Sequence, residues 1–338
     1  MALTVDIGVF AHDEAEGIAA MVARLAAQDV LHTSGLAARV LILANGCTDG
    51  TAARATAAAG PGIEVVDLPE AGKSRTWNRF VHDLSRAEAD VLIFCDADIT
   101  FSTPDALSRL VGGLGARPGL WVLNSQPLKD IVVHPEGLRL LDQLIAAAGG
   151  GLDDWKTAVC GSLYVMPADR ARRFHLPAGL PVEDGFLRAM VLTDTLTAPE
   201  DFTRIDGLAG AFHIYASERT IPALIRHQTR IIIGSAINAA CFADIAALPG
   251  AHRAAALAAA GADPDWLSGV IRARLPRFPY GFVPFGLLTK RLARLAARPR
   301  NLLRPERVAV ALMGFGFDLI VYLRAQGAML RGHGAGFW

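Results

Sequence analysis

Two acidic residues separated by one alanine follow an apolar run in the first third of the chain. Asp96 and Asp98 come directly after residues 91–95, Val-Leu-Ile-Phe-Cys, which predict a buried strand. Because residues i and i+2 of a strand point the same way, both carboxylates can face one site. Hard divalent cations prefer such oxygen ligands and also accept phosphate oxygens. The pair therefore predicts a metal site at the end of a strand, with a solvated turn as the alternative.

A second acidic pair stands at the start of a helical pattern. Glu183 and Asp184 precede residues whose spacing predicts a helix to residue 192. Acids in this position can cap a helix, because they accept hydrogen bonds from its first N–H groups and interact favourably with its dipole. A carboxylate can also act as a general base that takes the proton of a hydroxyl group. These residues alone leave both roles open.

The segments around the acids alternate between strand and helix patterns. The predicted strands are residues 5–10, 40–44, 63–67, 91–95, 120–123, 158–166 and 209–215. The predicted helices are residues 14–27, 51–59, 73–84, 183–192 and 221–240. This order predicts an α/β fold with a mostly parallel sheet covered by helices on both faces. Ligands bind at the carboxyl ends of the strands in such sheets, where Asp96 and Asp98 stand.

Composition limits the class of protein. The 338 residues are 52% hydrophobic and 20% charged, which excludes a disordered chain and allows one large or two ordinary domains. The four cysteines are scattered and lack the sequence spacing of a zinc site or a disulfide framework. Residues 1–6 lack the basic start of a signal peptide, so a reducing cytoplasm is the expected compartment.

The net charge of zero conceals two oppositely charged parts. Residues 272–338 hold twelve arginines and lysines against two acids, a charge of +10, so residues 1–271 carry −10. A chain that is basic along its whole length, as many nucleic-acid binders are, is therefore not indicated. The shift in composition predicts an α/β domain at residues 1–240 and a helical, basic and apolar tail at residues 241–338.

Several segments occur in an order that is typical of one enzyme family. They are residues 6–14 (DIGVFAHDE), 44–51 (ANGCTDGT), 72–78 (GKSRTWN), 96–98 (DAD), Gly161-Ser162 with residues 167–174, and 182–184 (VED). Together they make the chain resemble the family 2 glycosyltransferases of the GT-A fold, over roughly residues 3–235. In that family the corresponding segments include a D-x-D motif and an x-E-D motif.

The resemblance implies a metal-dependent glycosyltransferase that moves a sugar from a nucleotide-sugar donor to an acceptor hydroxyl, with inversion. It implies Asp184 as the general base and Glu183 as the residue that orients the base or binds the acceptor. It implies a Mn²⁺ or Mg²⁺ ion, held by Asp98, Asp96 and His213, that neutralises the leaving diphosphate. The donor-binding residues that it implies are Ala11, Glu14, Asn45, Lys73, Arg75, Asp96 and Arg230.

The basic tail predicts contact with a membrane surface, whereas the zero net charge of the whole chain argues against a nucleic-acid partner. Residues 290–298 form a basic amphipathic helical pattern beside the apolar residues 278–288. Residues 308–323 are apolar, but they contain Asp318 and are short for a membrane span. A basic and apolar surface binds anionic lipid, so we expect a peripheral protein at the inner face of the cell membrane, with a lipid or lipid-linked acceptor. Packing of the tail on the domain, or on a second copy, is the alternative.

Two other functions remain open from the sequence. One is a retaining GT-A transferase with a small soluble acceptor, and the other is an inactive GT-A domain that serves as a scaffold. A dehydrogenase is not indicated, because Ala-His-Asp-Glu at residues 11–14 follows the first strand in place of a glycine-rich phosphate loop.

Overall fold

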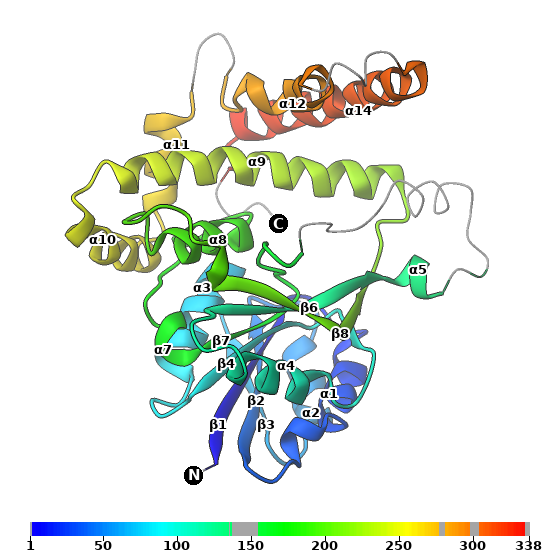
Figure 1. Cartoon of the computed structure of the whole chain (residues 1–338), viewed down its shortest axis with the longest axis vertical. Helices are drawn as coiled ribbons and strands as arrows, with labels where there is room; N and C mark the ends of the chain where they lie inside the picture. The colour runs from blue at the N-terminus through cyan, green and yellow to red at the C-terminus, as the bar shows by residue number, and fades with distance from the viewer. Residues whose placement is uncertain (1, 135, 137–154, 277–280, 298–303, 335–338) are drawn as a thin grey trace. The chain divides into compact units, whose positions relative to one another are not determined.

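The computed structural model describes residues 2–134, 136, 155–276, 281–297 and 304–334 (Figure 1). Their contacts divide the chain into two compact units. The first unit comprises Met1–Pro177, Glu183–Ser217 and Pro249–Ala262, and the second comprises Ala178–Val182, Glu218–Leu248 and Asp263–Trp338. The predicted domain boundary after residue 240 lies within the helix α9 (Ile221–Ala246).

Eight strands of the first unit form one sheet in the order β3-β2-β1-β4-β7-β6-β8-β5. They are β1 (Leu3–Ala11), β2 (Leu36–Asn45), β3 (Ile63–Leu68), β4 (Val91–Asp96), β5 (Thr100–Phe101), β6 (Val122–Lys129), β7 (Leu163–Pro167) and β8 (Ile205–Tyr215). The first four neighbours run parallel, whereas β7 is antiparallel to β4 and β6, and β5 is antiparallel to β8. The predicted α/β fold is confirmed, and its sheet is mixed.

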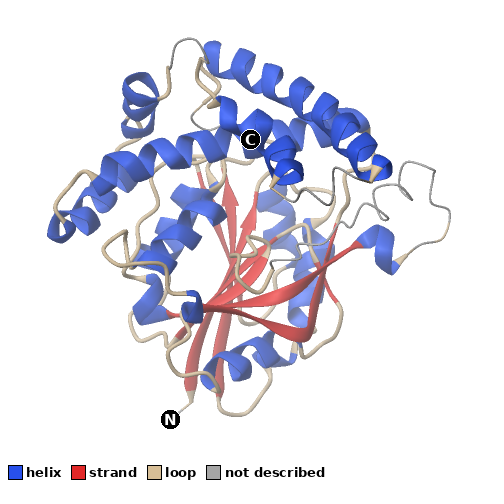
Figure 2. Cartoon of the chain, turned by 45° about the horizontal axis from the view of Figure 1, so that its top comes forward, coloured by secondary structure: helices blue, strands red, loops and turns tan. Residues whose placement is uncertain are grey.

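Helices lie on both sides of this sheet (Figure 2). In the first unit they are α1 (Ile18–Ala26), α2 (Thr51–Ala58), α3 (Lys73–Asn78), α4 (Ala106–Gly115), α5 (Asp130–Val133), α7 (Ala168–Ala171), α8 (Glu183–Thr193) and α10 (Gly250–Ala262). The predicted helix at residues 73–84 divides into α3 and a π-helical segment, Arg79–Leu84. Helix α1 begins four residues later than predicted, because residues 14–17 form a turn in which the carbonyl of Glu14 accepts from the N–H groups of Gly17 and Ile18.

The central strand β1 shows why the sheet is covered on both faces. Val5, Ile7 and Val9 are fully buried in the core cluster that includes the apolar faces of α1 and α4. On the opposite face Phe10 stacks on Phe94, with ring centroids 6.4 Å apart. This alternation follows from the two-residue period of a strand, so every residue of β1 from Val5 onward is buried.

A buried acid stabilises the amino end of β1. The carboxylate of Asp6 accepts hydrogen bonds from Nε and Nη2 of Arg39 on β2, both at 3.1 Å. It also accepts hydrogen bonds from the backbone N–H and Nε of Arg86, at 2.6 and 2.7 Å. Burial alone would raise the pKa of Asp6, but these hydrogen bonds outweigh burial, so its pKa lies below its ordinary value. The cluster therefore ties β1 to β2 and to the loop before β4.

The second unit is helical. Helix α14 (Pro305–Leu330) packs on α9 and on α12 (Phe285–Ala296), and α11 (Trp266–Arg274) packs on α9. Arg291 of α12 donates two hydrogen bonds to Asp318 of α14, at 2.8 and 3.0 Å. Three of the predicted tail cations, Arg277, Arg298 and Arg300, lie outside the described residues.

Two described helices have the length and composition to cross a membrane. They are α9 and the stretch Arg307–Leu330 of α14, which is longer than the apolar residues 308–323 that the sequence predicted to be short for a span. Half of the most apolar part of α9 is buried, against 22% of that of α14. Large apolar side chains of α14 that are exposed are Val310, Leu312, Met313, Leu319, Ile320, Leu323 and Leu330.

Replacing Asp6 by alanine should lower the free energy of unfolding by about 3 kcal/mol at pH 7, because Arg39 and Arg86 lose their buried counter-charge. A carboxyl group with a depressed pKa stabilises the folded state above its unfolded pKa, and this contribution is lost as pH falls through its folded pKa. Urea unfolding of wild type and D6A should therefore differ less at pH 3 than at pH 7.

Glu64→Ala is the matched control, since Glu64 pairs with the same Arg39 at 3.7 Å but is 61% exposed. This substitution should lower the free energy of unfolding by less than about 1 kcal/mol. A D6A loss no greater than the E64A loss would contradict the role of the buried cluster.

Candidate active site

The ammonium group of Lys73 joins three elements at the carboxyl end of the sheet. Lys73 begins α3, and its Nζ lies 2.6 Å from Asp96 Oδ1 at the end of β4 and 3.2 Å from Glu183 Oε1 at the start of α8. It also donates a hydrogen bond to the carbonyl of Gly161 at 3.1 Å. Burial lowers the pKa of Lys73, but the two carboxylates more than compensate, so its pKa lies above the ordinary value and the group is charged.

Asn45 positions the start of α3. Its side-chain Nδ2 donates to the carbonyl of Ala11 at 2.7 Å, and its Oδ1 accepts from the backbone N–H of Gly72 at 3.2 Å. The side chain thus links the ends of β1 and β2 to the residue before Lys73. Both polar atoms of the Asn45 side chain therefore have protein partners. Contact of Ala11 or Asn45 with a nucleotide-sugar donor stays a prediction.

A layer of buried aromatic rings supports Lys73. Trp77, four residues along α3, donates from Nε1 to the hydroxyl of Tyr164 at 2.8 Å. Phe94 stacks on both rings, with centroids 5.5 Å from Trp77 and 4.6 Å from Tyr164. Residues four apart on a helix share a face, so Trp77 anchors the same face that carries Lys73. The sequence analysis missed Tyr164, which belongs to no motif.

The carboxyl ends of β1 and β4 carry more negative charge than Lys73 neutralises. Burial raises the pKa of Glu14 to about 7, and the carboxylates of Asp98, Asp49 and Asp96 add to that effect. Burial likewise raises the pKa of Asp96 to about 6, with Lys73 opposing and Asp98 reinforcing the rise. Asp98 itself is exposed. Such crowding of carboxylates is favourable for binding a divalent cation.

The two residues of the second acidic pair, Glu183 and Asp184, make different contacts. Glu183 makes the ion pair with Lys73 and is 14% exposed. Oδ1 of Asp184 accepts from the backbone N–H of Gly185 at 2.6 Å, as expected at the first turn of a helix. A Cβ atom on Gly161 would lie 3.3 Å from Cβ and 3.4 Å from Oδ2 of Asp184. Because Gly161 has no side chain, Asp184 can pack closely against it. The carbonyl of the same glycine accepts the hydrogen bond from Lys73.

Three other predicted residues have different surroundings. Arg75 pairs with Glu70, with Nε 3.0 Å from Oε2. His213 of β8 is fully buried, its Nδ1 lies 2.9 Å from Ser125 Oγ, and burial lowers its pKa to about 4. Its Nε2 has no hydrogen-bond partner among the described residues. Arg230 lies on α9 in the second unit.

Asp96, Asp98 and His213, the predicted metal ligands, do not appear among the described residues as a group whose ligand atoms all lie within 4.8 Å of one another. In this structure Asp96 pairs with Lys73, and His213 is hydrogen-bonded to Ser125. Within the described part of the chain, one group of three potential ligands has all its ligand atoms within 4.8 Å of one another. That group is His12, Asp13 and Cys47, which the sequence analysis did not assign to a metal.

Residues 6–125 match the family described as glycosyl transferase family 2. Among solved structures, the chain is similar to glucosyl-3-phosphoglycerate synthase from Mycobacterium tuberculosis in complex with phosphoglyceric acid. That match has 21% identity and a TM-score of 0.50, and covers 73% of this chain and 81% of that chain. It is also similar to a mannosyltransferase from Pyrobaculum calidifontis in complex with GDP-Man and Mn²⁺, with 17% identity, a TM-score of 0.52, and coverage of 96% and 87%. No curated protein matches the chain. The structural likeness confirms the predicted GT-A fold.

Replacing Lys73 by methionine should lower the free energy of unfolding by about 3 kcal/mol at pH 7, because Asp96 and Glu183 lose the cation that they share. Chemical denaturation measures the change. Arg79→Met is the control: Arg79 pairs with Asp83 at 3.1 Å, but the two side chains are 52% and 51% exposed. That loss should be less than about 0.5 kcal/mol, and equal losses would contradict a central role for Lys73.

Proposed function

We propose that this chain, whose residues 6–125 match glycosyl transferase family 2, transfers a sugar from a nucleotide-sugar donor to an acceptor hydroxyl. The proposal includes a Mn²⁺ or Mg²⁺ ion and inversion at the sugar carbon. The observation that carries it is the group of carboxylates around Lys73 at the carboxyl ends of β1 and β4. The similar mannosyltransferase from Pyrobaculum calidifontis is in complex with GDP-Man and Mn²⁺, which supports the donor class and the cation.

The residues at this edge fit a hard cation. Asp98 is exposed, and the neighbouring Glu14 and Asp96 also offer carboxylate oxygens. Because Lys73 already holds one oxygen of Asp96, Asp98 is the main protein ligand in this proposal. His213, whose buried Nε2 lacks a partner among the described residues, stays a predicted third ligand. When bound, the cation would neutralise the diphosphate that leaves the sugar.

The acids at the start of α8 supply the base. Asp184 takes the proton of the acceptor hydroxyl, and Glu183, held by Lys73, fixes the first turn of the helix that carries it. A carboxylate base beside the reacting sugar carbon suits direct displacement with inversion. Glu14 and the backbone of Ala11 contact the nucleoside part of the donor. Arg75 and Arg230 are proposed only as contacts to the donor phosphates.

We further propose a lipid or lipid-linked acceptor, reached at an anionic membrane surface. Within the second unit, α9, α12 and α14 form a groove of about 350 Å³ whose lining is both apolar and basic. Leu287, Leu288 and Phe317 contribute apolar surface to it, and Lys290 and Arg294 contribute positive charge. In the described part of the chain, neither Lys290 nor Arg294 forms an ion pair. This combination suits an anionic head group with an attached chain.

We propose that the protein is a peripheral enzyme at the inner face of the cell membrane, and the apolar and basic groove supports this location. A retaining enzyme with a small soluble acceptor is the other candidate, since the similar synthase from Mycobacterium tuberculosis is in complex with phosphoglyceric acid. The anomeric configuration of the product, measured by NMR, decides between inversion and retention.

Asp98→Asn should abolish the metal-dependent part of donor binding, because it removes the main carboxylate ligand. Asp184→Asn should bind the donor normally and lose about 10²–10⁴-fold in transfer rate, because the hydroxyl proton has no acceptor. A thermal-shift screen of nucleotide sugars with Mn²⁺ or Mg²⁺ identifies the donor. Calorimetry then measures binding, and release of nucleoside diphosphate measures transfer.

The control is Asp169→Asn, an acid of α7 with a side chain that is 70% exposed, which should change neither quantity. Metal-dependent donor binding by D98N at the wild-type level would contradict the proposed metal site. Sugar transfer by D184N at the wild-type rate would contradict the proposed general base.

Charge reversal at two positions of α12, Lys290→Glu with Arg294→Glu, should weaken binding to anionic liposomes at least about 10-fold, since each cation near the surface contributes about 1 kcal/mol. Sedimentation with vesicles that contain an anionic phospholipid measures the partition. Binding by the wild type should also fall at high salt.

The matched control reverses two exposed arginines of the first unit, Arg24→Glu with Arg54→Glu, for the same change in net charge. Equal weakening by both pairs would leave only a net-charge effect and contradict the proposed surface. Wild-type protein that stays on vesicles at high salt would indicate insertion of α14 instead.

A further inference from the structure

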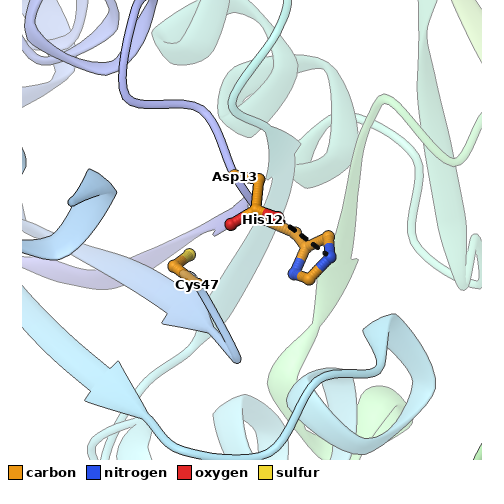
Figure 3. A group of neighbouring side chains, drawn as sticks. All are labelled: His12, Asp13 and Cys47. Atoms are coloured by element: carbon orange, nitrogen blue, oxygen red, sulfur yellow. Dashed lines mark ion pairs between the residues drawn. The ribbon is translucent and has the colours of Figure 1, made fainter. Parts of the chain in front are cut away.

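Three side chains of different chemistry meet where β1 and β2 end. His12 and Asp13 directly follow β1, and Cys47 lies two residues after β2 (Figure 3). One ligand atom from each residue lies within 4.8 Å of the other two. The sequence hides this group, because 34 residues separate His12 from Cys47 and no short motif contains both. Parallel pairing of β1 with β2, with Ala11 opposite Ala44, brings the two loops together.

The protein holds His12 in the orientation that a metal ligand needs. Its Nδ1 lies 2.7 Å from the backbone carbonyl of Asn45. A carbonyl oxygen only accepts hydrogen bonds, so Nδ1 carries the proton and the lone pair of the ring stays on Nε2. Nε2 is the atom that faces Asp13, at 3.9 Å from Oδ2 (Figure 3). Metal-bound histidines commonly have such a carbonyl partner on their other nitrogen.

Thr48 holds the carboxylate of Asp13. Oδ1 accepts a hydrogen bond from the backbone N–H of Thr48 at 2.7 Å, and the Thr48 hydroxyl lies 3.4 Å from Oδ1 and 3.5 Å from Oδ2, the oxygen nearer to His12. Asp13 also has a φ of 53°, a left-handed backbone that is uncommon outside glycine. The side chains of His12 and Asp13 are 42% and 41% exposed, so a cation and a water molecule can reach them.

We propose that His12 Nε2, Asp13 Oδ2 and Cys47 Sγ bind one zinc-type divalent cation, with a fourth position open to water or ligand. A set of nitrogen, oxygen and sulfur ligands suits Zn²⁺ rather than Mg²⁺, which favours oxygen alone. The site is therefore distinct from the carboxylate edge at Asp96 and Asp98. Tetrahedral bonds of about 2.0–2.3 Å put ligand atoms roughly 3.3–3.8 Å apart. The 3.9 Å between His12 Nε2 and Asp13 Oδ2 is close to this spacing.

The site lies on the loop that leads to Glu14. Glu14 follows Asp13 directly, and its backbone N–H donates to Thr51 Oγ1 at 2.7 Å. A cation held between His12, Asp13 and Cys47 would join this loop to the loop after β2. Its occupancy would thus fix the segment from which Glu14 points to the acidic edge.

Co²⁺ is the probe for this site, because it replaces Zn²⁺ and gives an absorption band when a thiolate binds it. The full chain, stripped of metals with a chelator, should bind one Co²⁺ with a thiolate-to-cobalt band, and one equivalent of Zn²⁺ should abolish the band. Excess Mg²⁺ should not. Cys47→Ala should lose the band, and His12→Ala should bind Co²⁺ at least about 10-fold more weakly.

Two controls separate this site from others. His32→Ala removes an exposed histidine outside the group, and Asp98→Asn removes the acid of the proposed hard-cation site. Both should keep the thiolate band and the affinity for Co²⁺. Absence of the band in the wild type, or its persistence in C47A, would overturn the proposal. Circular dichroism of each variant shows that a lost band is not lost folding.

Discussion

The ammonium group of Lys73 is the contact on which the geometry of the candidate site depends. It lies at the first residue of α3 and reaches β4 through Asp96, α8 through Glu183, and the loop before β7 through the carbonyl of Gly161. Because α8 also carries Asp184, the cation that pairs with Asp96 also holds the helix that carries the proposed base. In the proposed function, the metal-binding and base-carrying parts of the site would therefore be coupled through one side chain, whose own position is set by Asn45 and Trp77.

The acidic side chains near the two ends of β1 have opposite surroundings. At the amino end, Asp6 is fully buried, and two arginines satisfy it through four hydrogen bonds. At the carboxyl end, Glu14 and Asp96 have pKa values raised to about 7 and about 6 by burial and by neighbouring acids. A satisfied buried acid contributes stability, whereas crowded acids cost stability until a cation or proton joins them. The second arrangement is the one expected at a functional edge.

Sequence patterns predicted the α/β class, most of the strands and the place of Asp96 at the end of a strand, because burial on two faces leaves long apolar runs such as residues 91–95. The short strand β5 was not predicted. The family resemblance implied Lys73 and Glu183 as site residues, but not that the two would pair. Pairing depends on how α3 and α8 approach each other, which no local pattern encodes. For the same reason the spacing of cysteines argued against a thiol-containing metal site, although parallel strands bring Cys47 to His12. His213 shows the reverse: its place on β8 was predicted, and its partner Ser125 was not.

Charge balance supplies a reason for metal dependence that does not rely on resemblance. A nucleotide-sugar donor brings a diphosphate, and the edge where it is proposed to bind already holds Glu14, Asp96 and Asp98. The charge of Lys73 is shared between Asp96 and Glu183, so it cannot also neutralise the diphosphate without weakening those pairs. Bringing two anionic partners together in a partly buried site costs free energy, and either a cation between them or protonation of the acids lowers that cost. In the proposed function a divalent ion would therefore favour donor binding as well as aid departure of the diphosphate.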